Sequence, residues 1–213
     1  MKILNFTLAL VFTVFLMACG SKDKTDTTSD NKKTDGDSKV ENTSNTNSNT
    51  DTKTAGDGVM LSPVGKIEAA GTKGNVPNFT WQEDGKEMST ADLKGKVLFI
   101  NMWATWCGPC IKEMPELSEI SNELKDKDFK MVGLSVFHQE GTPEVKDFLE
   151  QKPVSYWIVD GNDELVNAFE QSIGSTIESI PTTFIVDKDG KIVETLIGSR
   201  DKAAFMEIIN KYL

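Results

Sequence analysis

Two cysteines, Cys107 and Cys110, stand two residues apart in the stretch NMWATWCGPCIKEMP, residues 101–115. Such a pair can be half of a metal site, a structural disulfide or a redox couple. A structural zinc site needs four ligands, and from residue 59 onward the only other Cys or His is His138. Carboxylates would have to complete the site, so the spacing disfavours a metal, and we expect no cofactor.

A structural disulfide between these cysteines would close a loop of only a few residues. The stabilisation that a disulfide gives grows with the length of the loop it closes. Although an exported chain favours disulfides, this one would contribute little to folding. Its position is better explained by chemistry.

The redox interpretation gives each residue of the motif a role. Cys107 directly follows an apolar run and opens a predicted helix, whose N-terminus carries partial positive charge and unpaired N–H groups. Both favour the thiolate, so we expect the pKa of Cys107 to be lowered. Cys110 lies one turn further on the same face. Cys107 would attack a partner's disulfide, and Cys110 would resolve the mixed disulfide, with Pro109 stiffening the turn.

The surrounding sequence alternates strand and helix patterns. Continuous apolar runs such as KVLFINMWA are typical of strands buried on both faces of a parallel sheet. The predicted strands are 78–82 with a short partner in KEMST, 96–104, 130–137, 155–160, 182–187 and 191–198. The predicted helices begin at Cys107 (kinked at Pro115), 142–152 (Thr142 as N-cap, Pro143 first), 162–171 and 201–213. This order predicts an α/β fold with a central mixed β-sheet flanked by helices.

The N-terminus reads as an export signal. Residues 3–18 are almost wholly apolar, follow Lys2 and end in small residues, as in a signal peptide; a short N-terminal membrane anchor is the alternative. The segment LMACGS, residues 16–21, resembles the bacterial lipobox, which implies that Cys19 is lipidated and becomes the mature N-terminus. Otherwise Cys19 would be removed or free. Lipidation explains the odd cysteine count.

The next segment has a different composition. Residues 20–58 are almost entirely Ser, Thr, Asn, Asp, Lys and Gly, and such a segment buries too little surface to offset its ordering entropy. We therefore expect a signal peptide at 1–18, a lipidated Cys19 and disordered polar tether at 19–58, and one folded domain at 59–213. The tether would be a plain spacer. The formal net charge of −10 argues against nucleic acid as a partner.

The motifs together resemble the thioredoxin superfamily and, more closely, the TlpA/ResA group of membrane-anchored thiol–disulfide oxidoreductases. WCGPC (106–110) is identical to the active-site motif of thioredoxin. DLKGKVLFINMWATWCGPC (92–110) and IPTTFIVDKDGKIVETLIG (180–198) match the group's active-site and proline segments. The resemblance covers about residues 74–213. It implies a thioredoxin-like fold with an N-terminal β-hairpin extension and a central insertion around 138–172.

The resemblance also implies roles for residues around the motif. Pro181 matches the cis-proline that faces the disulfide; an ordinary trans proline is the alternative. Backbone groups beside it would pair with an extended substrate segment. Trp106 would shield the disulfide and contact partners, or else simply pack in the core, as we expect for Trp103. The implied substrate-binding residues are Trp106, Gly108, Pro109, Ile180 and Thr182.

One position departs from thioredoxin. Asn101 stands where thioredoxin has a buried Asp, and an amide cannot shuttle a proton. Glu113 lies three residues after Cys110, and in the ResA group a glutamate at this spacing tunes the thiols. It would raise the pKa of a thiolate or act as a base for Cys110. The alternative is an ordinary solvated glutamate.

The first functional hypothesis is a lipid-anchored, monomeric protein-disulfide reductase on the extracytoplasmic face of a bacterial membrane, acting in cell redox homeostasis. The resemblance implies disulfide-containing client proteins, such as apocytochrome c during cytochrome c assembly or an oxidised methionine sulfoxide reductase. A membrane thiol transporter would donate electrons.

Two other functions are considered. A thiol peroxidase of the redoxin/peroxiredoxin type shares the fold, but its peroxidatic cysteine usually follows Thr and Pro and has an Arg nearby. Here WATW precedes Cys107, and Arg200 is the only arginine. A non-enzymatic lipoprotein binding module would keep the cysteine pair as a relic.

Overall fold

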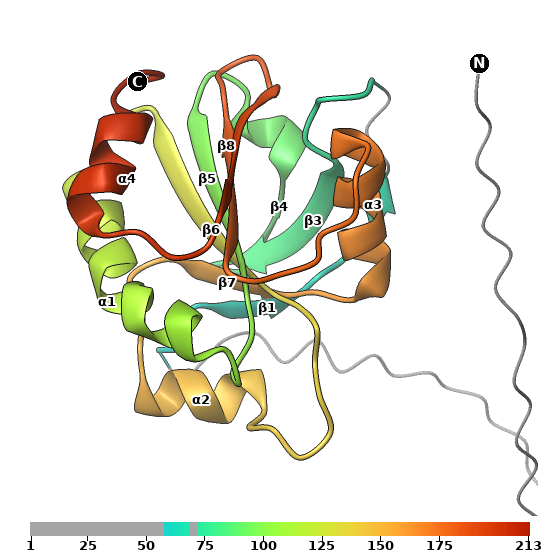
Figure 1. Cartoon of the computed structure of the whole chain (residues 1–213), viewed down its shortest axis with the longest axis vertical. Helices are drawn as coiled ribbons and strands as arrows, with labels where there is room; N and C mark the ends of the chain where they lie inside the picture. Colours follow the sequence, from blue (N-terminus) through green and yellow to red (C-terminus); the bar gives the residue numbers. More distant parts are fainter. Residues whose placement is uncertain (1–57, 69–71) are drawn as a thin grey trace, which may run out of the picture. The chain divides into compact units, whose positions relative to one another are not determined.

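The structure is a computed structural model that describes residues 58–68 and 72–213. The predicted signal peptide, Cys19 and all of the polar segment but its last residue lie outside the described residues. Figure 1 shows the described part with its elements labelled.

A six-stranded mixed sheet forms the centre of the fold, in the order β1-β7-β6-β5-β8-β9. Strands β1, β7, β6 and β5 run parallel, whereas β8 is antiparallel to β5 and β9 to β8. The strands are β1 (Leu61–Pro63), β5 (Val97–Trp103), β6 (Phe129–Ser135), β7 (Trp157–Asp160), β8 (Thr182–Val186) and β9 (Ile192–Ile197). Every residue of β5 is buried, as its continuous apolar sequence predicts for a central strand.

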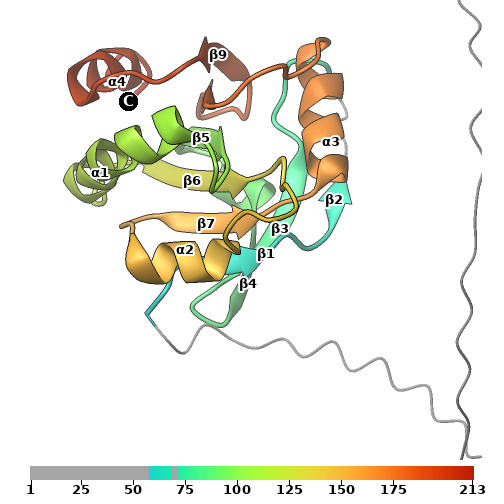
Figure 2. The same cartoon turned by 60° about the horizontal axis from the view of Figure 1, so that its bottom comes forward.

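Helices cover both faces of this sheet. They are α1 (Gly108–Glu123), α2 (Val145–Gln151), α3 (Asp163–Ile173) and α4 (Lys202–Ile209). The apolar sides of α1, α2 and α4 share one core cluster, while that of α3 belongs to the other, and Figure 2 shows the same division. Phe99 of β5 and Phe205 of α4 meet edge to face at 5.0 Å in the first cluster. The predicted helix-flanked mixed sheet is confirmed.

A smaller antiparallel sheet packs beside α3. It consists of β2 (Ile67–Glu68), β3 (Asn78–Glu83) and β4 (Lys86–Ser89). Phe79 and Trp81 of β3 are buried in the α3-side core with Phe169. A 3-10 turn, Thr90–Leu93, then leads into β5, and Ser89 and Asp92 form its capping box. The predicted β3–β4 hairpin is present, but the sequence analysis missed β1 and β2, which are three and two residues long.

The start of α2 was predicted wrongly. The helix begins at Val145, and Glu144 makes no side-chain capping bond. The Thr142 hydroxyl instead donates to the carbonyl of Gln139, and the carbonyl of Pro143 accepts from Thr105. These two bonds hold the segment as a loop against the start of α1. In contrast, Asn162 caps α3 through the Leu165 N–H.

The helices of the described residues are short. None of them has the length and apolar character needed to cross a membrane.

Candidate active site

The two cysteines form a disulfide at the start of α1. Their Cα atoms are 5.3 Å apart, and Cys107 is the N-cap of the helix, whose Sγ accepts a hydrogen bond from the backbone N–H of Cys110 at 3.3 Å. This N–H is one of the donors that a helix start leaves without a backbone partner. A thiolate at Cys107 would receive the same hydrogen bond together with the positive end of the helix. The predicted position of the attacking thiol at a helix N-terminus is therefore present.

The surroundings of the two sulfur atoms differ. Cys110 is fully buried and Cys107 is 3% exposed, while the neighbouring Gly108 and Pro109 are exposed. Cys107 thus stands at the outer end of the pair. An incoming disulfide would meet Cys107 first, with Cys110 behind it.

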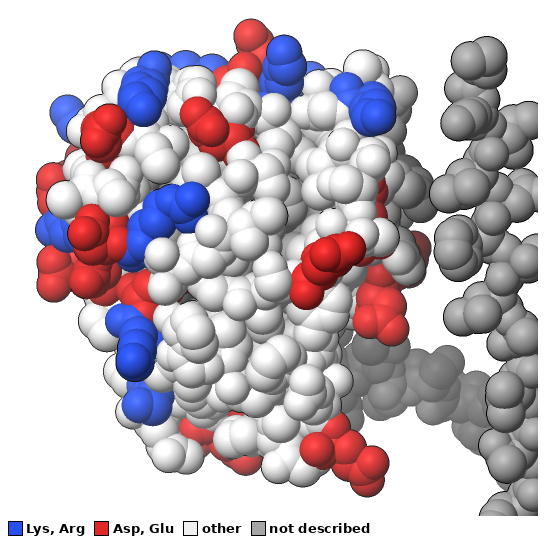
Figure 3. All heavy atoms as spheres, in the orientation of Figure 1, with Lys and Arg blue, Asp and Glu red and all other residues white. Residues whose placement is uncertain are grey.

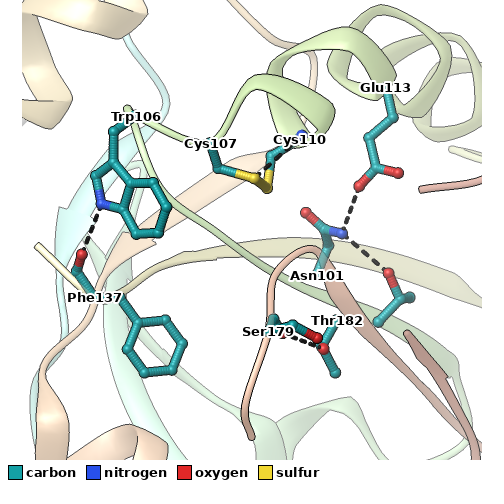
Figure 4. The surroundings of a disulfide bond; sticks show 9 residues. Asn101, Trp106, Cys107, Cys110, Glu113, Phe137, Ser179 and Thr182 are labelled. Carbon is teal, nitrogen blue, oxygen red and sulfur yellow. Dashed lines mark hydrogen bonds between the residues drawn. A yellow bond between two sulfur atoms is a disulfide. The ribbon is translucent and has the colours of Figure 1, made fainter. Parts of the chain in front are cut away.

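A buried polar network lies beside the pair on the inner side of α1. The Asn101 amide nitrogen donates to Glu113 Oε1 and to Thr183 Oγ1, each at 3.0 Å. In Figure 4 the amide oxygen of Asn101 points toward the disulfide. Asn101 comes from β5, Glu113 from α1 and Thr183 from β8, and Asn101 and Thr183 are paired in the sheet register. Three elements therefore fix the position of one carboxyl group near the thiols.

Glu113 has an unusual environment for a glutamate. It is 3% exposed, and its Oε2 has no hydrogen-bond partner among the described residues. Burial raises its pKa to about 7, while the Asn101 hydrogen bond and the Arg200 segment act in the opposite direction. The alternative of a solvated glutamate is therefore wrong. At neutral pH this carboxyl group is poised to accept or release a proton.

The segment before β8 lies below the disulfide in Figure 4, where Ser179 and Thr182 are drawn. The Ile180–Pro181 peptide bond is cis, as the resemblance implies, and the trans alternative is excluded. The carbonyl of Pro181 accepts from the Gly198 N–H at 2.8 Å. Thr182 is buried, and its hydroxyl donates to the carbonyl of Ser179 at 2.7 Å. Among the described residues, neither the backbone N–H nor the carbonyl of Ile180 has a backbone hydrogen-bond partner.

Trp106 lies on the opposite side of the disulfide from Glu113 (Figure 4). Its side chain is 40% exposed, and its Nε1 donates to the carbonyl of Phe137 at 2.8 Å. Core packing is therefore wrong for Trp106, whereas Trp103 is 1% exposed and lies in the core as predicted. The bond to Phe137 fixes the indole beside Cys107.

A groove opens beside Trp106, with a volume of about 430 Å³. Its apolar lining residues are Trp106, Phe137, Ile177 and Ile180, and its polar ones are Gln139, Glu178 and Ser179. We call it the active-site groove. It is formed by the loop after β6 and the segment between α3 and β8, so it lies between Trp106 and the cis-proline.

The sequence analysis missed several residues of this site. Thr183 and Phe137 contact site residues that are distant in sequence, and nothing local in the sequence marks such pairs. Arg200, which the sequence analysis considered only for the peroxidase alternative, lies in the β9–α4 connection, where its backbone and charge act on Glu113. His138, considered above only as a metal ligand, lies in the loop after β6, and its Nε2 is 3.2 Å from Asp160 Oδ1.

Comparison with known proteins agrees with this geometry. The Redoxin family model matches residues 69–208. The thiol-disulfide oxidoreductase ResA of Bacillus cereus is 37% identical over 129 residues, which are 60% of this chain and 70% of that protein.

Two solved structures extend the comparison. A thiol:disulfide interchange protein of the thioredoxin family from Chlorobium tepidum aligns with a TM-score of 0.58 and 32% identity, covering 68% of this chain and 99% of that one. The pneumococcal exposed lipoprotein thioredoxin from Streptococcus pneumoniae aligns with a TM-score of 0.50 and 28% identity, covering 63% and 98%.

The Redoxin match includes the segment that carries the CGPC disulfide, the cis-proline and the buried carboxyl group. The chain belongs to the Redoxin family, and within it to the TlpA/ResA-like thiol-disulfide oxidoreductases of thioredoxin fold.

Proposed function

We propose that this oxidoreductase works as a reductase of disulfides in client proteins, on the outer face of a bacterial membrane to which Cys19 anchors it. The reductive direction rests on the resemblance to the TlpA/ResA group, and the observation that carries thiol–disulfide exchange at Cys107 is its N-cap position, where its Sγ accepts the Cys110 N–H. This arrangement stabilises a thiolate, which is the species that attacks a disulfide.

The proposed reaction starts from the dithiol. The Cys107 thiolate attacks one sulfur of the client disulfide, and the other client sulfur leaves as a thiolate that takes up a proton. Cys110 then loses its proton and attacks Cys107 Sγ, which releases the second client thiol and leaves the Cys107–Cys110 disulfide. The client gains two electrons and two protons, and a membrane thiol transporter would restore the dithiol.

Glu113 is the proposed proton acceptor for Cys110. It lies on the same helix, three residues later, and it is held by Asn101. A carboxyl group with a pKa of about 7 can take a proton from a thiol and return it when the site is reduced again. In the protonated state it adds no negative charge that would oppose the Cys107 thiolate.

The client segment is proposed to bind beside the cis-proline. The exposed Gly108 and Pro109, the indole of Trp106 and the backbone of Ile180 frame the approach to Cys107, while Thr182 supports the proline segment through Ser179. An extended chain could pair with Ile180 in the manner of an added strand. Apocytochrome c or an oxidised repair enzyme such as a methionine sulfoxide reductase would present such a segment.

The membrane location rests on the sequence. The apolar run that ends in LMACGS and the polar segment after Cys19 support an anchored protein, and one structural neighbour is the pneumococcal exposed lipoprotein thioredoxin. Radiolabelled palmitate incorporated into the full chain but not into Cys19→Ser would support the anchor; equal labelling would contradict it.

Two cysteine variants test the reductase. Cys107→Ser should abolish reduction of insulin by the protein, because no attacking thiolate remains. Cys110→Ser should still attack but not resolve, so it should accumulate mixed disulfides with its clients. Full insulin reduction by Cys107→Ser would refute the mechanism. If Cys110→Ser expressed in cells yields no disulfide-linked protein, while Cys107 instead forms sulfenic acid rapidly with hydrogen peroxide, the thiol peroxidase alternative replaces it.

A further inference from the structure

The active-site groove lies where a chain that reaches Cys107 must pass. Trp106 directly precedes Cys107, and Ile180 directly precedes the cis-proline. Both residues line the groove, so it continues from the disulfide along the two segments that flank it. A client cysteine bonded to Cys107 would therefore bring its neighbouring residues into the groove.

The β6–α2 loop forms one wall of the groove, and the backbone conformation of Phe137 and its hydrogen bond to Trp106 fix the position of this wall. Phe137 has a φ of 55°, a conformation that non-glycine residues seldom adopt. In this conformation its carbonyl binds the Trp106 indole and the residue still lines the groove. With Ile177 and Ile180 on the opposite wall, the groove offers an apolar surface to a side chain next to the client cysteine.

The charges around the groove have one sign. Among the described residues that line it, Glu178 is the only charged one. The Glu178 side chain is exposed, and Oε1 accepts a 3.4 Å hydrogen bond from Thr176. Glu140, also exposed, follows the lining residue Gln139.

The other side of the disulfide differs in charge. There the β9–α4 connection carries Arg200, whose guanidinium donates to the carbonyls of Ile197 and Gly198. Figure 3 shows a broad face without charged side chains in the middle of the view, and the charged side chains at its right-hand edge at mid-height are acidic. The segment between α3 and β8 runs on that side in Figure 1.

We propose that the active-site groove selects client segments in which an apolar residue and a Lys or Arg lie next to the reactive cysteine, with Glu178 as the residue that determines the preference for positive charge. The apolar side chain would lie against Phe137, Ile177 and Ile180, and the cationic side chain would reach Glu178 at the rim. The inference rests on the proposed reductase function and names the class of client within it.

The test uses three synthetic peptides, each with one internal disulfide and a leucine beside the first cysteine. They differ only in the residue on its other side, which is Lys, Gln or Glu. The reduced full-length protein is mixed with each peptide, and the second-order rate of peptide dithiol formation is measured at low ionic strength. Each rate is divided by the rate at which the same peptide reacts with the small uncharged thiol 2-mercaptoethanol, which removes differences in disulfide reactivity among the peptides.

The Lys peptide should react fastest and the Glu peptide slowest, with the Gln peptide between them. The Lys peptide should be about fivefold faster than the Glu peptide, because a partly exposed charge pair contributes only a modest free energy. The difference should shrink at high salt. Glu178→Lys should reverse the order. The control Glu87→Lys, which makes the same charge change on β4 outside the groove, should retain it. Replacing the peptide's leucine with serine should slow reduction about tenfold.

The outcomes separate the two proposals. Equal rates for the three peptides, or the same order in Glu178→Lys as in the wild type, would overturn the selection by Glu178 while leaving the reductase intact. If Glu87→Lys also reversed the order, the effect would come from net charge, and the selection by Glu178 would again be overturned. Failure to reduce any peptide, together with failure to reduce insulin, would remove the reductase function itself.

Discussion

At the scale of single residues, Glu113 is the least conventional group in the protein. The fold keeps a carboxyl group this deeply buried because Asn101 holds one oxygen, because the Arg200 segment favours the charged form, and because the group can also be protonated. Asn101 can donate without itself titrating. The site therefore has one titrating carboxyl group, whereas an Asp at position 101 would add a second one that repels it.

The raised pKa of Glu113 predicts how stability depends on pH. The pKa is about 7 in the folded protein and 4.5 without the fold, so between these values the folded state binds more protons than the unfolded state. The free energy of unfolding should therefore fall as pH rises from about 4.5 to 7, by about 3 kcal/mol in all. Glu113→Gln removes this loss, so its stability relative to wild type should rise by about that amount between pH 4.5 and pH 8.

Urea unfolding of the oxidised proteins at several pH values measures this difference. Glu87→Gln, at an exposed position on β4, is the matched control and should follow the wild-type profile. If the wild type and Glu113→Gln differ by a constant amount at every pH, Glu113 is not titrating in this range.

At the scale of elements, the order of strands and helices could be predicted because most elements carry a local signal. β5 and β6 are continuous apolar runs, and α3 has an Asn cap and a terminal Gly174. β1 lacks such a signal, because three residues ending in Pro63 become a strand only by pairing with β7. Likewise, the start of α2 depends on bonds from Thr142 and Thr105 to the loop, which compete with helical capping.

Thr142, the predicted cap of α2, and Asn162, the observed cap of α3, should respond differently to substitution. Asn162→Ala removes an oxygen that accepts the Leu165 N–H, and it should lower the free energy of unfolding by about 1 kcal/mol. Thr142→Ala removes only an exposed bond to the Gln139 carbonyl outside the helix. We expect a change within about 0.5 kcal/mol for it. Chemical denaturation of both variants gives the comparison, and equal losses would mean that Thr142 acts as a cap after all.

The presence or absence of a local sequence signal also decides which residues of the site could be predicted. The cysteines, Asn101, Glu113 and Pro181 lie in short motifs that a single sequence can display. Thr183 is 82 positions from Asn101 along the chain, and only the pairing of β5 with β8 brings them together. The partners that hold the site in place are therefore the part that needed the three-dimensional fold.

At the scale of the whole molecule, the main sheet separates two apolar cores. Phe205 and Phe99 pack in the core of α1, α2 and α4, whereas Phe169 and Phe184 stack at 4.9 Å in the core of α3. Layers on the two sides of a sheet lie well apart, and among the described residues only the partly buried Ile180 packs against both clusters. The cores should therefore respond independently to small changes in packing.

This independence predicts additive effects. Phe205→Leu and Phe169→Leu should each lower the free energy of unfolding by about 1–2 kcal/mol, and the double variant should equal their sum within about 0.5 kcal/mol. The pair Phe169→Leu with Phe184→Leu, in one core and in ring contact, is the comparison and should deviate from additivity. A large coupling between Phe205 and Phe169 would show that the sheet transmits packing changes between its faces.

The groove and the thiols are built by different parts of the chain. The thiols, Asn101 and Glu113 belong to β5 and α1, whereas the groove is closed by Phe137 and Gln139 after β6 and by residues 177–180 before β8. If the groove selects clients as proposed above, substitutions in these two connecting segments would exchange one set of clients for another during evolution while the redox couple stays untouched. Two gene copies could diverge in clientele this way, and an engineer could redirect the enzyme by the same route.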